Sequence, residues 1–174
     1  MIERVETERL VLRPITMDDV DLLVDLNSDP EVMRFINGGL PMARDEVVDA
    51  VRKHIGHRWF AFERSTDAAV GWFALVPTGD GERELGYRMH RTMWGKGYAT
   101  EGSRVMLAKA FADPGVQRVW AQTMTVNTRS RAVMERCGMR FVRTFVGDWG
   151  PKFDGAEHGD VEYEITRSEW NTHE

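Results

Sequence analysis

The segment best suited to chemistry is a short glycine-containing run, Trp94-Gly95-Lys96-Gly97-Tyr98-Ala99-Thr100. It lies between an expected strand and an expected helix, so its glycines let the backbone approach a ligand while the first N–H groups of the helix face that ligand. The helix dipole favours an anion at this place, and Lys96 adds a positive charge. The run therefore predicts a phosphate-binding site, with a tight turn whose glycines only relieve strain as the alternative.

Two other kinds of phosphate-binding loop do not fit this spacing. A nucleoside-triphosphate loop reads Gly-x-x-x-x-Gly-Lys-Ser/Thr, whereas Lys96 lies between the two glycines and Tyr98 follows the second. A dinucleotide loop needs a third glycine or an alanine where Thr100 stands, and an acidic residue about 20 positions later, where the chain reads Val119-Trp120-Ala121. The spacing excludes both loops.

Histidine and cysteine show no pattern typical of metal or covalent chemistry. His54 and His57 are three residues apart, but no carboxylate–histidine pair or cysteine set accompanies them. Cys137, the single cysteine, ends an apolar helical stretch without a histidine close in sequence, which is typical of a small buried residue. We therefore expect no metal and no cysteine nucleophile.

Length and composition limit the class of protein. The chain has 174 residues, 42% of them hydrophobic, which fits one domain over residues 1–174. Its formal charge of -5, without long runs of either sign, argues against nucleic-acid binding and mildly favours a cationic partner. Charged residues interrupt every apolar window, and no secretory segment opens the chain, so we expect no membrane association and a cytoplasmic location.

The elements that would position the glycine run begin with a strand and two helices. Residues 10–14 form the expected strand, and the spacing of Thr16 and Asp19 is typical of a helix N-terminus. That helix should fade near residues 28–30, because a proline disfavours helical geometry in the residue before it. A second helix is expected over residues 43–56, where a glycine ends it.

Strands and helices alternate in the second half of the chain. An alternating pattern over residues 82–89 places Leu85, Tyr87 and Met89 on one face of a strand and Glu84 on the other. The remaining expected elements are a hairpin of strands 59–62 and 70–76, a helix from the glycine run to about residue 112, a strand 119–124, a short helix 130–137, and strands 139–146 and 161–165. A loop rich in glycine and aromatic residues joins the last two strands.

Several ordered motifs together resemble the GNAT acetyltransferase superfamily. They are the run Gly95-x-Gly97-x-Ala99 after a strand, then Asn127-x-x-Ser130 and Glu135-Arg136-x-Gly138-Met139. Thr7-Glu8-Arg9-Leu10-x-Leu12-Arg13-Pro14, Glu84-Leu85-Gly86-Tyr87 and Trp94 to Glu101 are similar to its RimJ/RimL-like branch, which is named for acetylation of ribosomal-protein N-termini. The match spans most of the chain. It implies an α/β fold with a mixed, mostly antiparallel sheet of six or seven strands flanked by helices.

The resemblance also implies acetyl-CoA as the acyl donor, bound where the middle strands of the sheet part. The glycine run would hold its pyrophosphate, Tyr87 and Met89 would lie beside the pantetheine and acetyl groups, and Asn127 would hydrogen-bond the pantetheine. Arg131, or as the alternative Arg136, would reach the 3′-phosphate, although an arginine on a short helix is more often only solvated. The residues expected to bind the donor are Tyr87, Met89, Trp94, Gly95, Lys96, Gly97, Tyr98, Ala99, Thr100, Asn127 and Arg131.

Acyl transfer to an amine needs a neutral amine and a proton for the departing thiolate. By the same resemblance Glu84 would accept the amine proton through water, and Ser130 would donate to the thiolate. The alternatives are a solvated strand carboxylate for Glu84 and a helix cap for Ser130. The tyrosine that often acts as the acid in this superfamily corresponds to Met134 here.

The expected function is therefore transfer of an acetyl group from acetyl-CoA to a primary amine. The leading acceptor is the N-terminal α-amine of a protein or peptide, and otherwise a small-molecule amine. We expect the acceptor to bind at the glycine- and aromatic-rich loops over residues 37–39 and 148–154. The alternative is a catalytically inactive CoA-binding sensor or partner-binding protein of the same fold. A homodimer is compatible with either.

Overall fold

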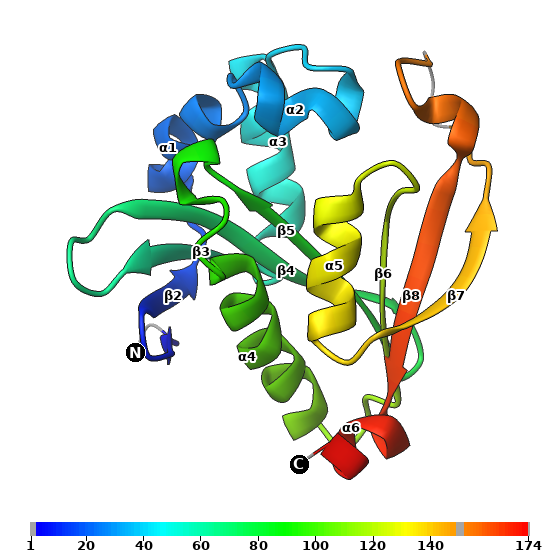
Figure 1. Cartoon of the computed structure of the whole chain (residues 1–174). Helices are drawn as coiled ribbons and strands as arrows, with labels where there is room; N and C mark the ends of the chain where they lie inside the picture. The colour runs from blue at the N-terminus through cyan, green and yellow to red at the C-terminus, as the bar shows by residue number, and fades with distance from the viewer. Residues whose placement is uncertain (1–2, 149–151, 174) are drawn as a thin grey trace.

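The computed structural model describes residues 3–148 and 152–173. Its centre is a sheet in the order β1-β2-β3-β4-β5-β6-β8-β7, with helices on both faces (Figure 1). The strands are β1 Val5–Glu6, β2 Leu10–Pro14, β3 Arg58–Glu63, β4 Ala69–Gly79, β5 Glu82–Met89, β6 Arg118–Met124, β7 Arg140–Phe145 and β8 Asp160–Thr166. The helices are α1 Val20–Leu26, α2 Pro30–Asn37, α3 Arg44–His54, α4 Tyr98–Ala112, α5 Thr128–Arg136 and α6 Arg167–His173. None of the helices in the described ranges is long and apolar enough to cross a membrane.

The sheet opens in its middle, between β5 and β6. These two strands pair in parallel from Glu82 opposite Arg118 to Glu84 opposite Trp120, and the described register ends there. On its other side β5 pairs with β4 along its whole length, up to Met89 opposite Gly71. The second half of β5 therefore has a strand partner on one side only, and α5 lies in front of the opening in Figure 1.

Each face of the sheet carries its own apolar core. Phe73, Leu85 and Met89 pack with Met106 and Leu107 of α4. A Cβ at Gly102 of α4 would lie 2.1 Å from Cζ of Phe73, so the helix can approach the strand this closely only because position 102 is glycine. The opposite face packs Phe60 and Trp72 against α1 and α3. The two faces thus offer two separate environments on either side of β5.

The structure confirms the expected α/β sheet and adds three elements that were not expected. The two-residue β1 brings the strand count to eight rather than six or seven, and α2 and α6 also went unrecognised. The Asp29-Pro30 pair was interpreted as the end of α1, but it also begins α2: Pro30 takes the first helical position, and the Asp29 side chain accepts from the N–H of Glu31. A helix of eight residues leaves too little periodicity to stand out in the sequence.

Candidate functional site

Two cavities lie against the second half of β5. The first, which we call the helix cavity, has a volume of about 430 Å³ and is lined by α2, the end of β5, Trp94, Ala99 and the start of α5. The second, the strand cavity, has a volume of about 410 Å³ and is lined by α2, β5, β6 and residues of the segment 146–160. Six residues line both cavities: Phe35, Ile36, Tyr87, Arg88, Asn127 and Ser130. The cavities therefore meet at a shared wall beside the sheet opening.

The glycine run forms the turn that starts α4, beside the helix cavity. Gly95 and Gly97 have φ values of +73° and +83°, a left-handed conformation that favours glycine. Gly97 is the N-cap residue of α4, and no side chain caps the helix there. The Gly97 carbonyl accepts the first hydrogen bond of the helix from the N–H of Glu101. A Cβ on Gly95 would meet no described atom within 4 Å. The turn is thus open on its outer side, where the first free N–H groups of a helix attract an anion.

Residues from the start of the chain hold this turn in place. The Arg9 side chain donates from Nη1 to the Lys96 carbonyl over 2.8 Å and from Nε to Glu101 over 2.7 Å, while Thr7 donates to the same carboxylate over 2.6 Å. Burial raises the pKa of Glu101, but the hydrogen bonds from Thr7 and Arg9 outweigh it and bring the pKa below its usual value. The sequence motif around Arg9 was noted for its resemblance only, and its role at the turn was missed.

Tyr87 and Ser130 join β5 to α5 at the shared wall. The Tyr87 hydroxyl donates to the Ser130 carbonyl at 3.0 Å and lies 2.9 Å from the Ser130 Oγ. Burial raises the pKa of Tyr87 well above its usual value, so this phenol stays protonated. The Ser130 side chain does not cap α5, contrary to the alternative considered for it, because Oδ1 of Asn127 accepts from the Ser130 N–H at 3.2 Å. The Ser130 hydroxyl therefore faces the shared wall.

Glu84 lines the strand cavity at the point where β5 and β6 part. Burial raises the pKa of its carboxyl group, and a hydrogen bond of 3.1 Å from Nε2 of Gln122 lowers it in part, leaving the pKa above the usual value. Gln122, on β6, was not among the expected site residues, since a lone glutamine on a strand carries no signal in the sequence. A half-buried carboxylate with a raised pKa beside a cavity has the properties of a proton acceptor.

The other expected donor-binding residues divide into two groups. The first group lines the helix cavity and consists of Met89, Trp94, Ala99 and Asn127. Trp94 donates from its indole N–H to the Met89 carbonyl, and Cζ of Arg129 lies 4.4 Å from the centroid of its ring. The linings do not include Gly95, Lys96, Gly97, Tyr98, Thr100 or Arg131. Tyr98 donates to Glu63, and Arg131 donates to Tyr163 and the Thr125 carbonyl. The roles of all these residues toward CoA remain predictions.

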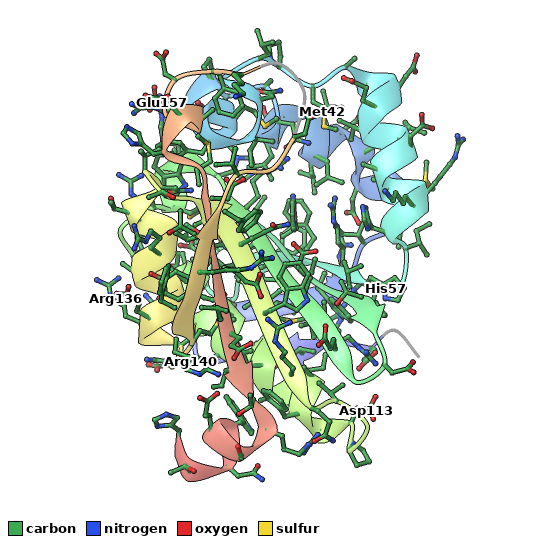
Figure 2. The ribbon with its side chains drawn as sticks, turned by 90° about the vertical axis from the view of Figure 1, so that its right-hand side faces the viewer. Met42, His57, Asp113, Arg136, Arg140 and Glu157 are labelled. Carbon is green, nitrogen blue, oxygen red and sulfur yellow. The ribbon has the colours of Figure 1, made fainter. Side chains whose placement is uncertain are left out.

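Two segments that are distant in sequence enclose the strand cavity. Phe35 and Ile36 come from α2, and Lys152 and Phe153 come from the segment before β8. A Cβ at Gly38 would lie 2.9 Å from Cβ of Phe153, so the two segments touch, and Figure 2 shows the turn that carries Glu157 close to α2. Residues 149–151 of the loop expected to bind the acceptor lie outside the described residues. The described part of the chain gathers no three His, Cys, Asp or Glu side chains that could hold a metal.

Comparison with protein families gives a match to the acetyltransferase (GNAT) domain over residues 9–140. Among its relatives, the FsC-acetyl coenzyme A-N(2)-transacetylase of Aspergillus fumigatus is 35% identical, over 94% of this chain and 76% of that protein. The N-acetyltransferase p20 of Bacillus licheniformis is 30% identical, over 74% of this chain and 78% of that protein.

Solved structures share the fold at lower identity. A GNAT-family acetyltransferase from Bacillus anthracis superposes with a TM-score of 0.80 at 24% identity, covering 95% of this chain and 99% of that one. The spermidine N-acetyltransferase of Vibrio cholerae, in complex with CoA and spermine, gives 0.79 at 18% identity with the same coverage. RimL, the ribosomal L7/L12 α-N-protein acetyltransferase, gives 0.78 at 16% identity, over 95% of each chain.

Proposed function

The chain belongs to the GNAT acetyltransferase family, and on that premise we propose that it acetylates a primary amine that enters the strand cavity while acetyl-CoA occupies the helix cavity. The observation that carries this proposal is the shared wall. The anion-attracting turn borders one cavity, the half-buried Glu84 borders the other, and Tyr87 and Ser130 stand between them. A two-substrate transfer needs two sites that meet at one point.

The donor fits the helix cavity by charge and by backbone geometry. The N-terminus of α4 offers free N–H groups for a pyrophosphate. Apart from Arg88, which lines both cavities, the charged side chains that line this cavity are Arg34, Arg129 and Glu31, an excess of positive charge suited to an anionic ligand. We infer that the thioester lies at the inner end of this cavity, next to the Ser130 hydroxyl.

The acceptor half of the reaction depends on Glu84. An α-amine with a pKa of roughly 7.7–8.0 is about one tenth to one fifth neutral at pH 7, whereas a lysine amine near 10.4 is roughly 0.04% neutral. An α-amine therefore needs little help, and Glu84 with its raised pKa would take the released proton through a water molecule. The cavity of about 410 Å³ is enclosed by α2 and the segment 152–160, which favours a small molecule or a flexible N-terminus over a folded protein surface.

Ser130 would assist the leaving group. The amine nitrogen bonds to the acetyl carbon, the carbon–sulfur bond breaks, and the electron pair leaves on the sulfur as the CoA thiolate. A thiol has a pKa of roughly 8.5, so a hydrogen bond from Ser130 stabilises the thiolate until water protonates it. The raised pKa of Tyr87 suits it to holding the Ser130 hydroxyl in position rather than to giving up its own proton.

Release of free thiol from acetyl-CoA tests this function. A panel of peptides, amino acids and their amides, and polyamines would be screened for amine-dependent thiol release, with mass spectrometry of the acetylated product. We expect release only when an amine is supplied. Binding of CoA without release, for any amine in the panel, would instead identify a catalytically inactive CoA-binding protein.

A further inference from the structure

Two buried guanidinium groups lie on the face of the sheet that carries the strand cavity. Arg58 of β3 and Arg88 of β5 both stack on Trp72, with Cζ 4.1 Å and 5.2 Å from the ring centroid. Burial lowers the pKa of each to about 10, and for Arg88 the charge of Arg58 adds to this effect. Both side chains therefore stay charged at neutral pH, in a place where a charge loses most of its hydration.

Neither guanidinium group is paired with a carboxylate among the residues that the structure describes. Arg88 donates from Nη1 to Oδ1 of Asn27 over 2.7 Å, which is a neutral partner. The Nε atoms of Arg58 and Arg88 are buried without a hydrogen-bond partner. A buried charge without a counter-ion is strongly destabilising, so it calls for a compensating group.

Only one of the two guanidinium groups reaches the site. Arg88 lines both cavities, whereas the linings do not include Arg58. Arg88 pairs across strands with Trp72, on the face opposite to Leu85 and Met89, which pack with α4. The Arg88 side chain thus belongs to the acceptor face of β5 rather than to the face of α4 and its phosphate-binding turn.

We propose that Arg88 binds a carboxylate that the acceptor carries next to its reactive amine, so that the acceptor is a free α-amino acid or a small molecule with an α-amino acid end. This inference rests on the proposed function and narrows the chemical class of the acceptor from any primary amine to an α-amino acid. A guanidinium fork matches a carboxylate with two parallel hydrogen bonds. The bound carboxylate would supply the missing counter-ion of Arg88.

The placement of Arg88 agrees with the proposed chemistry. Arg88 lines both cavities, as Tyr87 and Ser130 do, so an amine one carbon away from a carboxylate bound to Arg88 would lie near the shared wall where the thioester is proposed to lie. Glu84 is four residues earlier on the same face of the strand, about 13 Å away along the backbone, so a chain of water molecules would connect it to the amine. The other charged groups that line the strand cavity, Lys152 and Asp160, come from the segment before β8 and its first residue.

Paired acceptors test this proposal. Free α-amino acids and the same amino acids as primary amides would be compared by kcat/KM in the wild type and in Arg88→Gln, Arg88→Lys and Arg58→Gln. We expect the acid-to-amide ratio to fall about ten- to a hundredfold in Arg88→Gln, the value of a hydrogen-bonded charge pair, and to take an intermediate value in Arg88→Lys. Because the comparison is a ratio of ratios, differences in intrinsic amine reactivity cancel.

Arg58→Gln is the matched control, since it removes a charge from the same cluster without touching either cavity. Its acid-to-amide ratio should equal that of the wild type. An unchanged ratio in Arg88→Gln, or a wild type that acetylates the amides and not the acids, would overturn the proposal while leaving the acetyltransferase intact. If no amine gives thiol release, the proposed function fails, and calorimetric binding of the acids and amides to the CoA complex decides the role of Arg88. Equal affinity for acid and amide would then overturn it.

Discussion

The two cavities on either side of β5 are built in different ways. The turn beside the helix cavity is fixed by its own backbone conformation and held by Arg9, Thr7 and Glu101. The strand cavity is enclosed by an eight-residue helix, which ends in two left-handed glycines, and by a segment from the far end of the chain. In the proposed function, the donor would therefore meet a turn whose conformation is set by its own glycines, whereas the acceptor would meet side chains that the fold brings together from distant positions.

The largest expected effect is that of Glu84→Gln, which should change turnover but not donor binding. Glu84→Gln should lower kcat about a hundredfold below neutral pH without changing the KM for acetyl-CoA, because it removes the proton acceptor from the strand cavity alone. The raised pKa of Glu84 means that wild-type activity is present above this pKa and is lost as the pH falls through it. In alkaline buffer, above the pKa of the acceptor amine, the defect should shrink.

The pH–rate profile of kcat measures this effect. Glu82→Gln is the control, since Glu82 stands two residues earlier on β5, is not part of either cavity lining, and pairs instead with Arg118. If the acidic limb of the profile were identical in Glu84→Gln and the wild type, Glu84 would have no part in the proton transfer.

A smaller effect concerns the wall that both cavities share. Ser130→Ala should lower kcat about tenfold, roughly the value of one hydrogen bond to a charged group, while the melting temperature stays close to that of the wild type. Asn127→Ala, by contrast, should lower the free energy of unfolding by about 1 kcal/mol and the melting temperature by roughly 2–4 °C, because it removes the cap of α5. Full turnover in Ser130→Ala with a lower melting temperature would leave Ser130 a purely structural role.

On the helix-cavity side, Arg9→Ala should raise the KM for acetyl-CoA about fivefold and leave the KM for the acceptor unchanged. The reason is that Arg9 anchors the Lys96 carbonyl and Glu101, but its half-exposed side chain makes the ion pair worth only about 1 kcal/mol. Arg64→Ala is the comparison, since Arg64 bonds to the Thr7 carbonyl at the same corner without touching the turn. Steady-state kinetics with each substrate varied in turn would measure both KM values. An equal rise in the KM for acetyl-CoA and for the acceptor would show that the turn does not act on the donor alone.

The smallest effect tests the wall that α2 provides. Ile36 is about half exposed and lines both cavities, so Ile36→Ala should raise the KM for the acceptor about threefold through lost apolar contact. Leu40 is more exposed and outside both linings, and Leu40→Ala should have no effect on either KM. Equal behaviour of the two variants would remove α2 from the acceptor site.

The difference in construction between the two cavities also explains which features could be predicted from the sequence. The glycine run, the alternation along β5 and the short helix α5 are local patterns, and the structure places each of them as predicted or within a few residues, although Asn127 rather than Ser130 caps α5. Glu84 and Ser130 could be proposed because the resemblance to the GNAT superfamily assigns roles to these two positions of its motifs. The anchoring of the turn by Arg9 spans 87 residues to Lys96, and no local pattern predicts such a contact.

The acceptor side offered fewer signals. Asp29-Pro30 indicates the end of one helix and the start of another equally well, so α2 was missed together with its lining residues Phe35 and Ile36. The alternation along β5 places Arg88 on the same face as Glu84, but a charged residue on a strand is expected to be solvated unless its neighbours are known. Its burial against Trp72 and Arg58 depends on the pairing of β3, β4 and β5. The periodicity of the sequence does not predict such contacts between strands.

The opening between β5 and β6 also bears on aggregation. An unpaired strand edge normally invites another protein strand to add to the sheet, which is a hazard for any chain at high concentration. Here the edge that β5 loses after Glu84 lies inside the molecule, with α5 in front of it. A thin, flexible ligand can reach the backbone of that edge, whereas a neighbouring polypeptide cannot bring a strand alongside it. The fold thus keeps a reactive edge at its centre while protecting it from intermolecular pairing.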